Sequence, residues 1–168
     1  EFEQMEMEFF VEPGTQKKWL EYWRDARMSW WKSLSNNPNK FRYRAHDIDE
    51  LAHYADACYD IEYEYPWGFD ELEGIASRTD YDLKKHAEYS GSKLSYFDQQ
   101  KLDPETGKNG WRYTPFVIEP AAGATRGLLV YLLDAYHEET VPDADGNESS
   151  RVVMKLHPRL APIKVAVL

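Results

Sequence analysis

The chain has 168 residues, which is enough for one domain with a hydrophobic core, and no break in composition requires a second domain. Its net charge of −10 argues against nonspecific phosphate binding by the chain itself, since a nucleic-acid footprint shows as clustered Lys and Arg. The sequence has no run of about 20 apolar residues that could span a bilayer, and its first residues lack the basic and then apolar pattern of a secretion signal. We therefore expect a soluble, cytoplasmic protein without membrane segments.

The first ten residues, EFEQMEMEFF, alternate as a strand does. One face is apolar, and the other carries Gln4, Glu6 and Glu8 between Phe2 and Phe10. A solvent-facing half of a sheet would explain the acids, but it leaves the two aromatic rings on the acidic face unexplained.

Residues 17–34 predict one long amphipathic helix that follows a Pro-Gly turn and a candidate N-cap at Thr15. Its four tryptophans, at helical spacing, are expected to be core rather than a ligand stack. After a loop, FRYRA predicts a short strand, and Asp47 predicts the cap of a helix through about Cys58. This lone cysteine excludes an internal disulfide, and no nearby activating base marks it as a catalytic thiol.

DIEYEYPWG alternates as a strand that ends at Pro66 and Gly68. ELEGIASRTDYDLKKH predicts an irregular connection into a short helix, and residues 90–110 predict a polar surface excursion. YTPFVIEP predicts a strand, and GATRGLLVYLLDAYHEE predicts a helix that is apolar nearly all round and therefore buried. PDADGNESS predicts a hairpin loop before the strand VVMKLHP.

Strands and helices do not alternate strictly along the chain, which favours an α+β fold with a mainly antiparallel sheet flanked by helices. The five histidines never fall at metal-ligand spacing with a second His or Cys, so we assign no residue as a metal ligand. No nucleophile elbow and no phosphate-cradling glycine loop is present.

Carboxylates remain at the expected strand ends, accompanied by Arg78 and Arg126 beside glycines. Each alone is most simply a solvated charge next to a turn. Together they predict a pocket that pairs acids with a substrate ammonium group and arginines with carboxylate or phosphate. The acids concerned are Glu6, Glu8, Glu71, Glu73 and Glu119.

Four segments, EFEQMEMEFF, HYADACYDIEYEYPWGFDELEGIASRTDYDL, YTPFVIEPAAGATRG and LHPRLAPIKVAVL, closely resemble the catalytic domain of glycyl-tRNA synthetase of the homodimeric type. The resemblance covers nearly the whole chain apart from residues 90–110 and 141–150. It implies a class II aminoacyl-tRNA synthetase core that runs from the returning strand of motif 2 through motif 3. Residues 1–160 would be a partial catalytic domain, and residues 161–168 would lead into an anticodon-binding domain that this chain lacks.

By this resemblance, the enzyme activates glycine with ATP to glycyl-adenylate and transfers the glycyl group to tRNA(Gly), with Mg²⁺ neutralising phosphate charge. Arg126 and Glu119 are the expected catalytic residues. The expected glycine-binding residues are Glu6, Arg78, Glu119 and Ala121. The expected ATP-binding residues are Phe2, Gln4, Glu71 and Arg126, with Phe2 stacked on adenine.

The sequence departs from the family in two places, because many members have Ser where this chain has Ala121 and an acid where it has Thr125. Motif 1, which dimerises the family, and the first arginine-bearing strand of motif 2 lie outside the chain. We therefore expect a homodimer from the full-length protein and little or no activity from this chain alone. The alternatives are a non-catalytic class II synthetase-like binding module and a structural domain whose acids are merely solvated.

Overall fold

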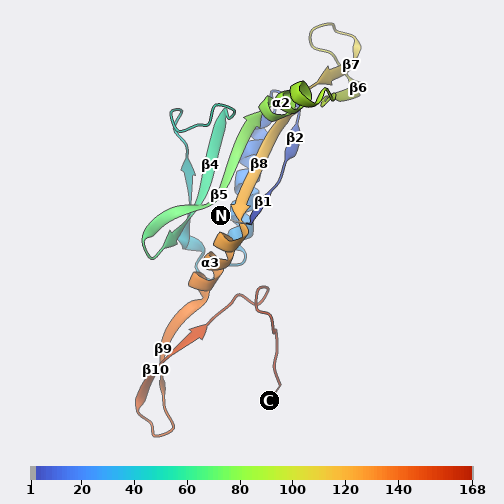
Figure 1. Ribbon diagram of the computed structural model, residues 1–168. Coiled ribbons are helices and arrows are strands. Elements are labelled where there is room, and N and C mark those ends of the chain that lie inside the picture. The colour runs from blue at the N-terminus through green and yellow to red at the C-terminus, as the bar shows by residue number, and fades with distance from the viewer. Residues whose placement is uncertain (1–2, 168) are drawn as a thin grey trace.

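The computed structural model describes residues 3–167, which form a six-stranded antiparallel sheet, three α-helices and two additional hairpins. The α+β class with mainly antiparallel strands is thus confirmed. The strand order in the sheet is β1-β8-β5-β4-β3, and β2 also pairs with β8 (Figure 1). The bounds of its strands are β1 Gln4–Glu6, β2 Phe9–Val11, β3 Phe41–Ala45, β4 Ala57–Tyr65, β5 Gly68–Thr79 and β8 Phe116–Gly123.

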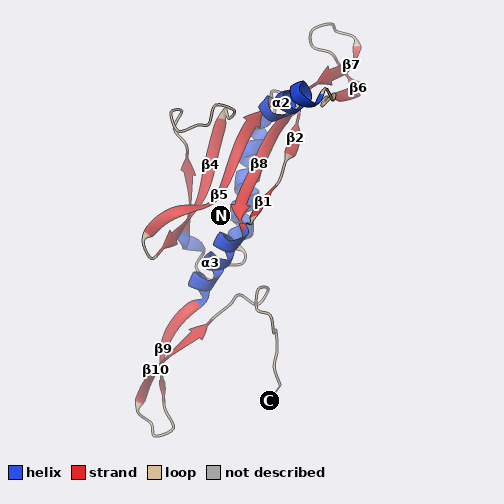
Figure 2. Cartoon of the chain, viewed as in Figure 1, coloured by secondary structure: helices blue, strands red, loops and turns tan. Residues whose placement is uncertain are grey.

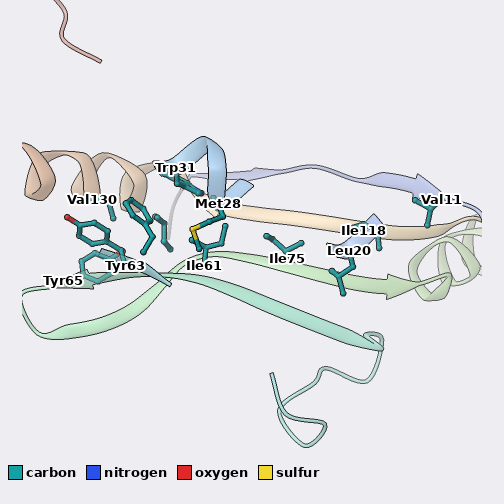
Figure 3. Packing of buried hydrophobic residues seen from close by; sticks show 13 residues of the cluster. Val11, Leu20, Met28, Trp31, Ile61, Tyr63, Tyr65, Ile75, Ile118 and Val130 are labelled. Carbon is teal, nitrogen blue, oxygen red and sulfur yellow. The ribbon is translucent and has the colours of Figure 1, made fainter. Parts of the chain in front are cut away.

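Helix α1, Gln16–Lys32, packs across one face of this sheet and leaves the other face open (Figure 2). Its buried residues Leu20, Met28 and Trp31 meet Ile61, Ile75 and other apolar residues of the sheet (Figure 3). The predicted core role is confirmed for Trp31 and for Trp19 and Trp23, which pack against this cluster. It is wrong for Trp30, which is 39% exposed. Buried aromatic rings of this size contribute much of the hydrophobic stabilisation of a small domain.

The other helices lie at opposite ends of the sheet (Figure 1). Helix α2, Tyr81–Ser90, follows β5 directly, as the sequence predicted for the short helix. Helix α3, Ala124–Ala135, follows β8. The predicted burial of α3 is wrong on one side, where Leu128 is 60% exposed and Leu129 and Leu132 are both about 40% exposed. The reason is its position at the end of the sheet, where only part of its surface meets other elements.

Two further predictions of local structure are wrong. Residues 47–56 form turns rather than a helix, although the Glu50 carboxylate does accept the backbone N–H of Asp47 as a capping residue would. The chain instead joins the sheet, where the N–H of Asp56 donates to the carbonyl of Ser77. Residues 68–79 are one long strand rather than an irregular connection. Ile61 and Glu62 of β4 pair with Glu73 and Glu71, which leaves Leu72 of β5 as the extra residue of a β-bulge and breaks the alternation that would mark the strand in the sequence.

The polar segment 90–110 contains most of an exposed hairpin, β6 Tyr96–Leu102 and β7 Asn109–Tyr113. The predicted hairpin loop near residues 141–150 is confirmed, and it joins β9 Tyr136–Pro142 to β10 Glu148–Met154, which project away from the sheet (Figure 1). The predicted helix through Glu139 is wrong at its end, because α3 ends at Ala135 and the chain continues as β9. A short 3₁₀ helix, Pro38–Lys40, precedes β3. From Lys155 to Val167 the described chain has neither helix nor strand. Within residues 3–167, no helix is both long and apolar enough to cross a membrane.

Candidate functional site

The open face of the sheet carries an acidic hollow of about 470 Å³, which we call the acid pocket. Its wall comes from β1, β2 and the residues between them, from β5 and β8, and from α2. The lining residues are Glu6, Glu8, Phe10, Arg78, Asp82, Leu83, His86, Val117 and Glu119. Three of the four predicted glycine-binding residues, Glu6, Arg78 and Glu119, therefore lie in one hollow.

Strand register explains how distant residues reach this face. Glu6 pairs with Ala121 of β8, and Ala76 of β5 pairs with Glu119. Directly paired residues point to the same face of a sheet, and successive residues alternate between faces. Residues of the opposite parity, such as Ile75 and Ile118, are fully buried on the α1 side. The acids thus gather on the open face because the apolar residues between them face α1.

Arg78 is held in place by two carboxylates. Its Nε and Nη2 atoms donate to the two oxygens of Asp82 at 2.6 and 3.2 Å, and its Nη1 atom donates to Oε1 of Glu119 at 3.0 Å. The turn into α2 brings Asp82 back to it, because Thr79 adopts a φ of 56°, which is uncommon for a β-branched residue. Guanidinium groups carry five N–H donors, so these three bonds leave Arg78 further donors for an anion.

Glu8 belongs to the same cluster; the sequence placed it among the acids of the expected pocket but not among the glycine-binding residues. Burial, followed by the hydrogen bond with Glu119, raises the pKa of Glu8 to about 7, which the positive charge of Arg78 partly counteracts. Two carboxyl groups this close favour a shared proton over two negative charges. In the sequence, the sign that Glu8 belongs to the site was its position on the same strand face as Glu6. The pairing with β8 is what places Glu8 beside Glu119.

Three of the four predicted ATP-binding residues lie beside the acid pocket, towards α3. Arg126 Nη1 donates to the backbone carbonyl of Glu71 at 2.9 Å and lies 3.9 Å from its carboxylate. Burial, followed by repulsion from Asp60, raises the pKa of Glu71. Gln4 pairs with Gly123 just before α3, so it lies on the same side of the sheet edge as Arg126. The fourth predicted residue, Phe2, lies outside the described residues.

Small residues form the floor between these two groups. Ala121 pairs with Glu6 on one side and with Gly74 on the other, and Gly74 in turn pairs with Asp60. A Cβ atom at Gly74 would lie 3.8 Å from the carboxylate of Glu71, in ordinary van der Waals contact. Short side chains keep this floor low, so a ligand can lie across the strands. Ala121, the fourth predicted glycine-binding residue, lies on this floor but is not among the residues that line the acid pocket.

The structure also brings together His46, Cys58 and Asp60, whose ligand atoms lie within 4.8 Å of one another. The sequence analysis missed this group because histidine and cysteine are twelve positions apart along the chain. One Asp60 oxygen already contacts His46 Nε2 at 2.7 Å and Arg44 Nη1 at 3.3 Å. Burial raises the pKa of the Cys58 thiol to about 12. Ion pairing beside a protonated thiol therefore accounts for the cluster without a metal.

The arrangement suits a small zwitterion next to a phosphorylated compound. Carboxylates of the acid pocket can attract an ammonium group, and Arg78 can bind a carboxylate within the same hollow. Across the low floor, Arg126 presents a second cation beside the carboxylate of Glu71. Carboxylate oxygens are suitable ligands for Mg²⁺, so Glu71 could coordinate a metal ion that binds together with phosphates.

No protein-family model matches the chain. Curated proteins do match it along its whole length. The glycine–tRNA ligase of Corynebacterium efficiens is 53% identical over 173 residues, which cover 100% of this chain and 35% of the ligase. The glycine–tRNA ligases of Cutibacterium acnes and Treponema denticola are 50% and 48% identical, again over 100% of this chain and over 34% and 36% of their own lengths.

The chain is thus a homologue of glycine–tRNA ligases, as the resemblance of its motifs predicted. It spans about a third of the length of the curated relatives that it matches.

Proposed function

We propose that this chain is part of the catalytic domain of a glycyl-tRNA synthetase, and that the full-length protein joins glycine to tRNA(Gly) with ATP. The observation that carries the proposal is the acid pocket, in which Glu6, Glu8 and Glu119 surround Arg78. Glycine has no side chain to grip, so its recognition depends on its two charged ends and on the exclusion of larger side chains. Identity of about 50% to glycine–tRNA ligases supports the same conclusion.

In the first step, a carboxylate oxygen of glycine attacks the α-phosphorus of ATP, and the bond to the β-phosphate oxygen breaks to release pyrophosphate. We assign the glycine ammonium to Glu6 and Glu119 and its carboxylate to Arg78, with Ala121 on the floor beside them. We assign ATP to Phe2, Gln4, Glu71 and Arg126, where Mg²⁺ bound with the phosphates would neutralise their charge. The protein contributes positioning and electrostatic stabilisation.

In the second step, a hydroxyl of the terminal ribose of tRNA attacks the glycyl carbonyl carbon. AMP leaves with the bonding electrons, and the hydroxyl proton is lost. We expect Glu119 to contribute to both steps, because its carboxylate accepts a hydrogen bond from Arg78 and also faces the site of the glycine ammonium group. We further propose a cytoplasmic homodimer, with residues 1–160 in the catalytic domain and residues 161–168 leading towards an anticodon-binding domain.

Glycine-dependent ATP–pyrophosphate exchange by the full-length protein tests this proposal, with alanine and serine as competitors. The variant Glu119→Gln keeps an acceptor for Arg78 but removes the charge that faces the ammonium group. Loss of one partner of a buried charge pair costs about 2–5 kcal/mol, so we expect the KM for glycine to rise about 30-fold or more. Glu148→Gln, on the exposed strand β10, is the matched control.

An unchanged KM in Glu119→Gln would contradict the assignment of this residue. Absence of exchange by the folded full-length protein would favour the alternative, a class II synthetase-like binding module that has kept the fold but not the reaction.

A further inference from the structure

A second hollow, of about 510 Å³, adjoins the acid pocket, and we call it the aromatic pocket. The two share Phe10 and Leu83 as a common wall. The remaining lining residues of the aromatic pocket come from β2 and the residue after it, from the segment that follows α2, and from the β6–β7 hairpin with the residues after it. They are Val11, Glu12, Lys93, Leu94, Ser95, Tyr96, Tyr113 and Pro115.

The aromatic pocket lies on the side of the acid pocket opposite to the Arg126–Glu71 pair. Strand β8 runs from Phe116 to Gly123 and leads into α3, which carries Arg126. Pro115, which precedes β8, lines the aromatic pocket, whereas Glu119 in the middle of β8 lines the acid pocket. Figure 1 shows the β6–β7 hairpin and α3 at opposite ends of the sheet. Three sites therefore follow one another along β8.

The lining offers exposed aromatic rings together with a positive charge. Phe10 and Tyr96 are 55% and 54% exposed, and Tyr113 meets Tyr96 edge to face with ring centroids 5.8 Å apart. The carboxylate of Glu12 is paired with Lys101, which removes its charge from the wall. Lys93 is then the remaining charged residue among those that line the pocket, so the lining has a positive charge.

We propose that the aromatic pocket binds an unpaired nucleotide at the 3′ end of tRNA by stacking its base on Tyr96 and Phe10. The inference rests on the proposed function. Transfer requires the terminal ribose to reach the glycyl carbonyl in the acid pocket, so the base attached to that ribose, or the next one, lies within one nucleotide of that pocket. The ATP side is taken by the first substrate, which leaves the aromatic pocket as the neighbouring hollow.

The chemistry of the pocket fits this occupant. Stacking of bases on aromatic side chains is tolerant of sequence and contributes about 1–3 kcal/mol per base. Lys93 supplies a cation for the adjoining phosphate. An apolar segment of protein is the competing occupant, but such a segment would gain nothing from the charge of Lys93.

The test compares the two steps of the reaction in the full-length protein. Tyr96→Ala removes the stacking ring, Tyr96→Phe keeps it, and Tyr89→Ala removes a tyrosine of α2 that is 83% exposed and does not line the pocket. Exchange of pyrophosphate into ATP needs no tRNA, whereas aminoacylation does. We expect Tyr96→Ala to raise the KM for tRNA about tenfold or more and to leave glycine-dependent exchange within about twofold.

A second measurement uses binding of intact tRNA and of the same tRNA without its unpaired 3′ nucleotides. Tyr96→Ala should weaken binding of the intact tRNA only, and Tyr96→Phe and Tyr89→Ala should weaken neither. An unchanged KM for tRNA alongside normal exchange would overturn the inference but not the proposed function. Equal losses in exchange and transfer would show that Tyr96 is structural and would also overturn it. Absence of exchange in the unmodified protein would overturn the proposed function and this inference together.

Discussion

Glu8 gives the acid pocket a property that can be measured as a pH dependence. Its pKa is raised from 4.5 to about 7, so its carboxyl group carries a proton below that pH and a negative charge above it. The groups that face it are Glu119, Arg78 and Asp82. A glycine ammonium group is attracted by the charged form alone. Glycine binding should therefore strengthen as the pH rises through about 7 and become constant above it.

The measurement is the KM for glycine in pyrophosphate exchange from pH 6 to 8.5, compared in the parent protein and Glu8→Gln. We expect the variant to lose the pH dependence that the parent shows. Histidines titrate in the same range and His86 lines the pocket, so His86→Gln is the control and should keep the dependence. Loss of the dependence in His86→Gln, with its retention in Glu8→Gln, would assign the titration to the histidine instead.

The same shift has a consequence for stability, with the opposite sign. Because the folded state binds the Glu8 proton more tightly than an unfolded chain does, it holds more protons between pH 4.5 and about 7. The contribution of Glu8 to the free energy of unfolding therefore decreases as the pH rises through that window. The pH that favours glycine binding is thus the pH at which Glu8 contributes least to the free energy of unfolding, as is common for sites that gather like charges.

At the residue scale, the sequence predicted which chemical groups matter better than it predicted their partners. Glu6, Arg78 and Glu119 were expected in one site and do line one hollow. The bonds from Arg78 to Asp82 and the contact of Glu8 with Glu119 could not be predicted, because they depend on the unusual φ of Thr79 and on the register of β8. Their roles in binding remain proposals.

At the element scale, a buried ion pair fastens α1 to the sheet. Glu73 of β5 is 1% exposed, and its carboxylate accepts the Nε–H of Arg27 at 2.7 Å and the indole N–H of Trp31. This acid is the exception on the apolar face, since its neighbours along β5 on that face include the fully buried Ile75. Removal of Arg27 would leave a buried carboxylate with the Trp31 donor but without a cation.

We expect Arg27→Ala to lower the free energy of unfolding by about 3 kcal/mol, at the lower end for a broken buried pair because Arg27 is partly exposed. Urea unfolding followed by tryptophan fluorescence measures the change. Lys85→Ala, which breaks the exposed pair with Glu88, is the control and should cost less than about 1 kcal/mol. Glu73→Gln in the Arg27→Ala background should restore part of the loss, and a further loss there would contradict this account.

Elements with an uninterrupted hydrophobic pattern were predicted well. Elements whose structure depends on pairing with residues distant in the sequence were not. The tryptophan spacing of α1 and the apolar run of β8 are local signals, and both elements formed as expected. Strand β5 contains two glycines and an irregular register with β4, which hid it from a period-two pattern. The exposed leucines of α3 show the converse, because an apolar helix predicts burial only where another element lies against it.

At the scale of the whole molecule, the positive charges on the open face of the sheet are balanced by neighbouring carboxylates. Its arginines, as far as the described residues show, each lie near a carboxylate: Arg42 by Glu62, Arg44 by Asp60, Arg78 by Asp82 and Arg126 by Glu71. The chain as a whole carries ten more negative than positive charges. Such a surface attracts an ammonium group but repels a polyphosphate.

We therefore expect the isolated 168-residue chain to bind ATP more weakly than 1 mM and to give no measurable glycine-dependent pyrophosphate exchange, even when it is folded. Isothermal titration with MgATP and the exchange assay, run beside the full-length protein, check the two parts. Near-ultraviolet circular dichroism of the tryptophan cluster confirms that the isolated chain has kept its core. Robust exchange by the chain alone would mean that its own paired arginines suffice for the α-phosphate, and that additional cations are not required for the first step.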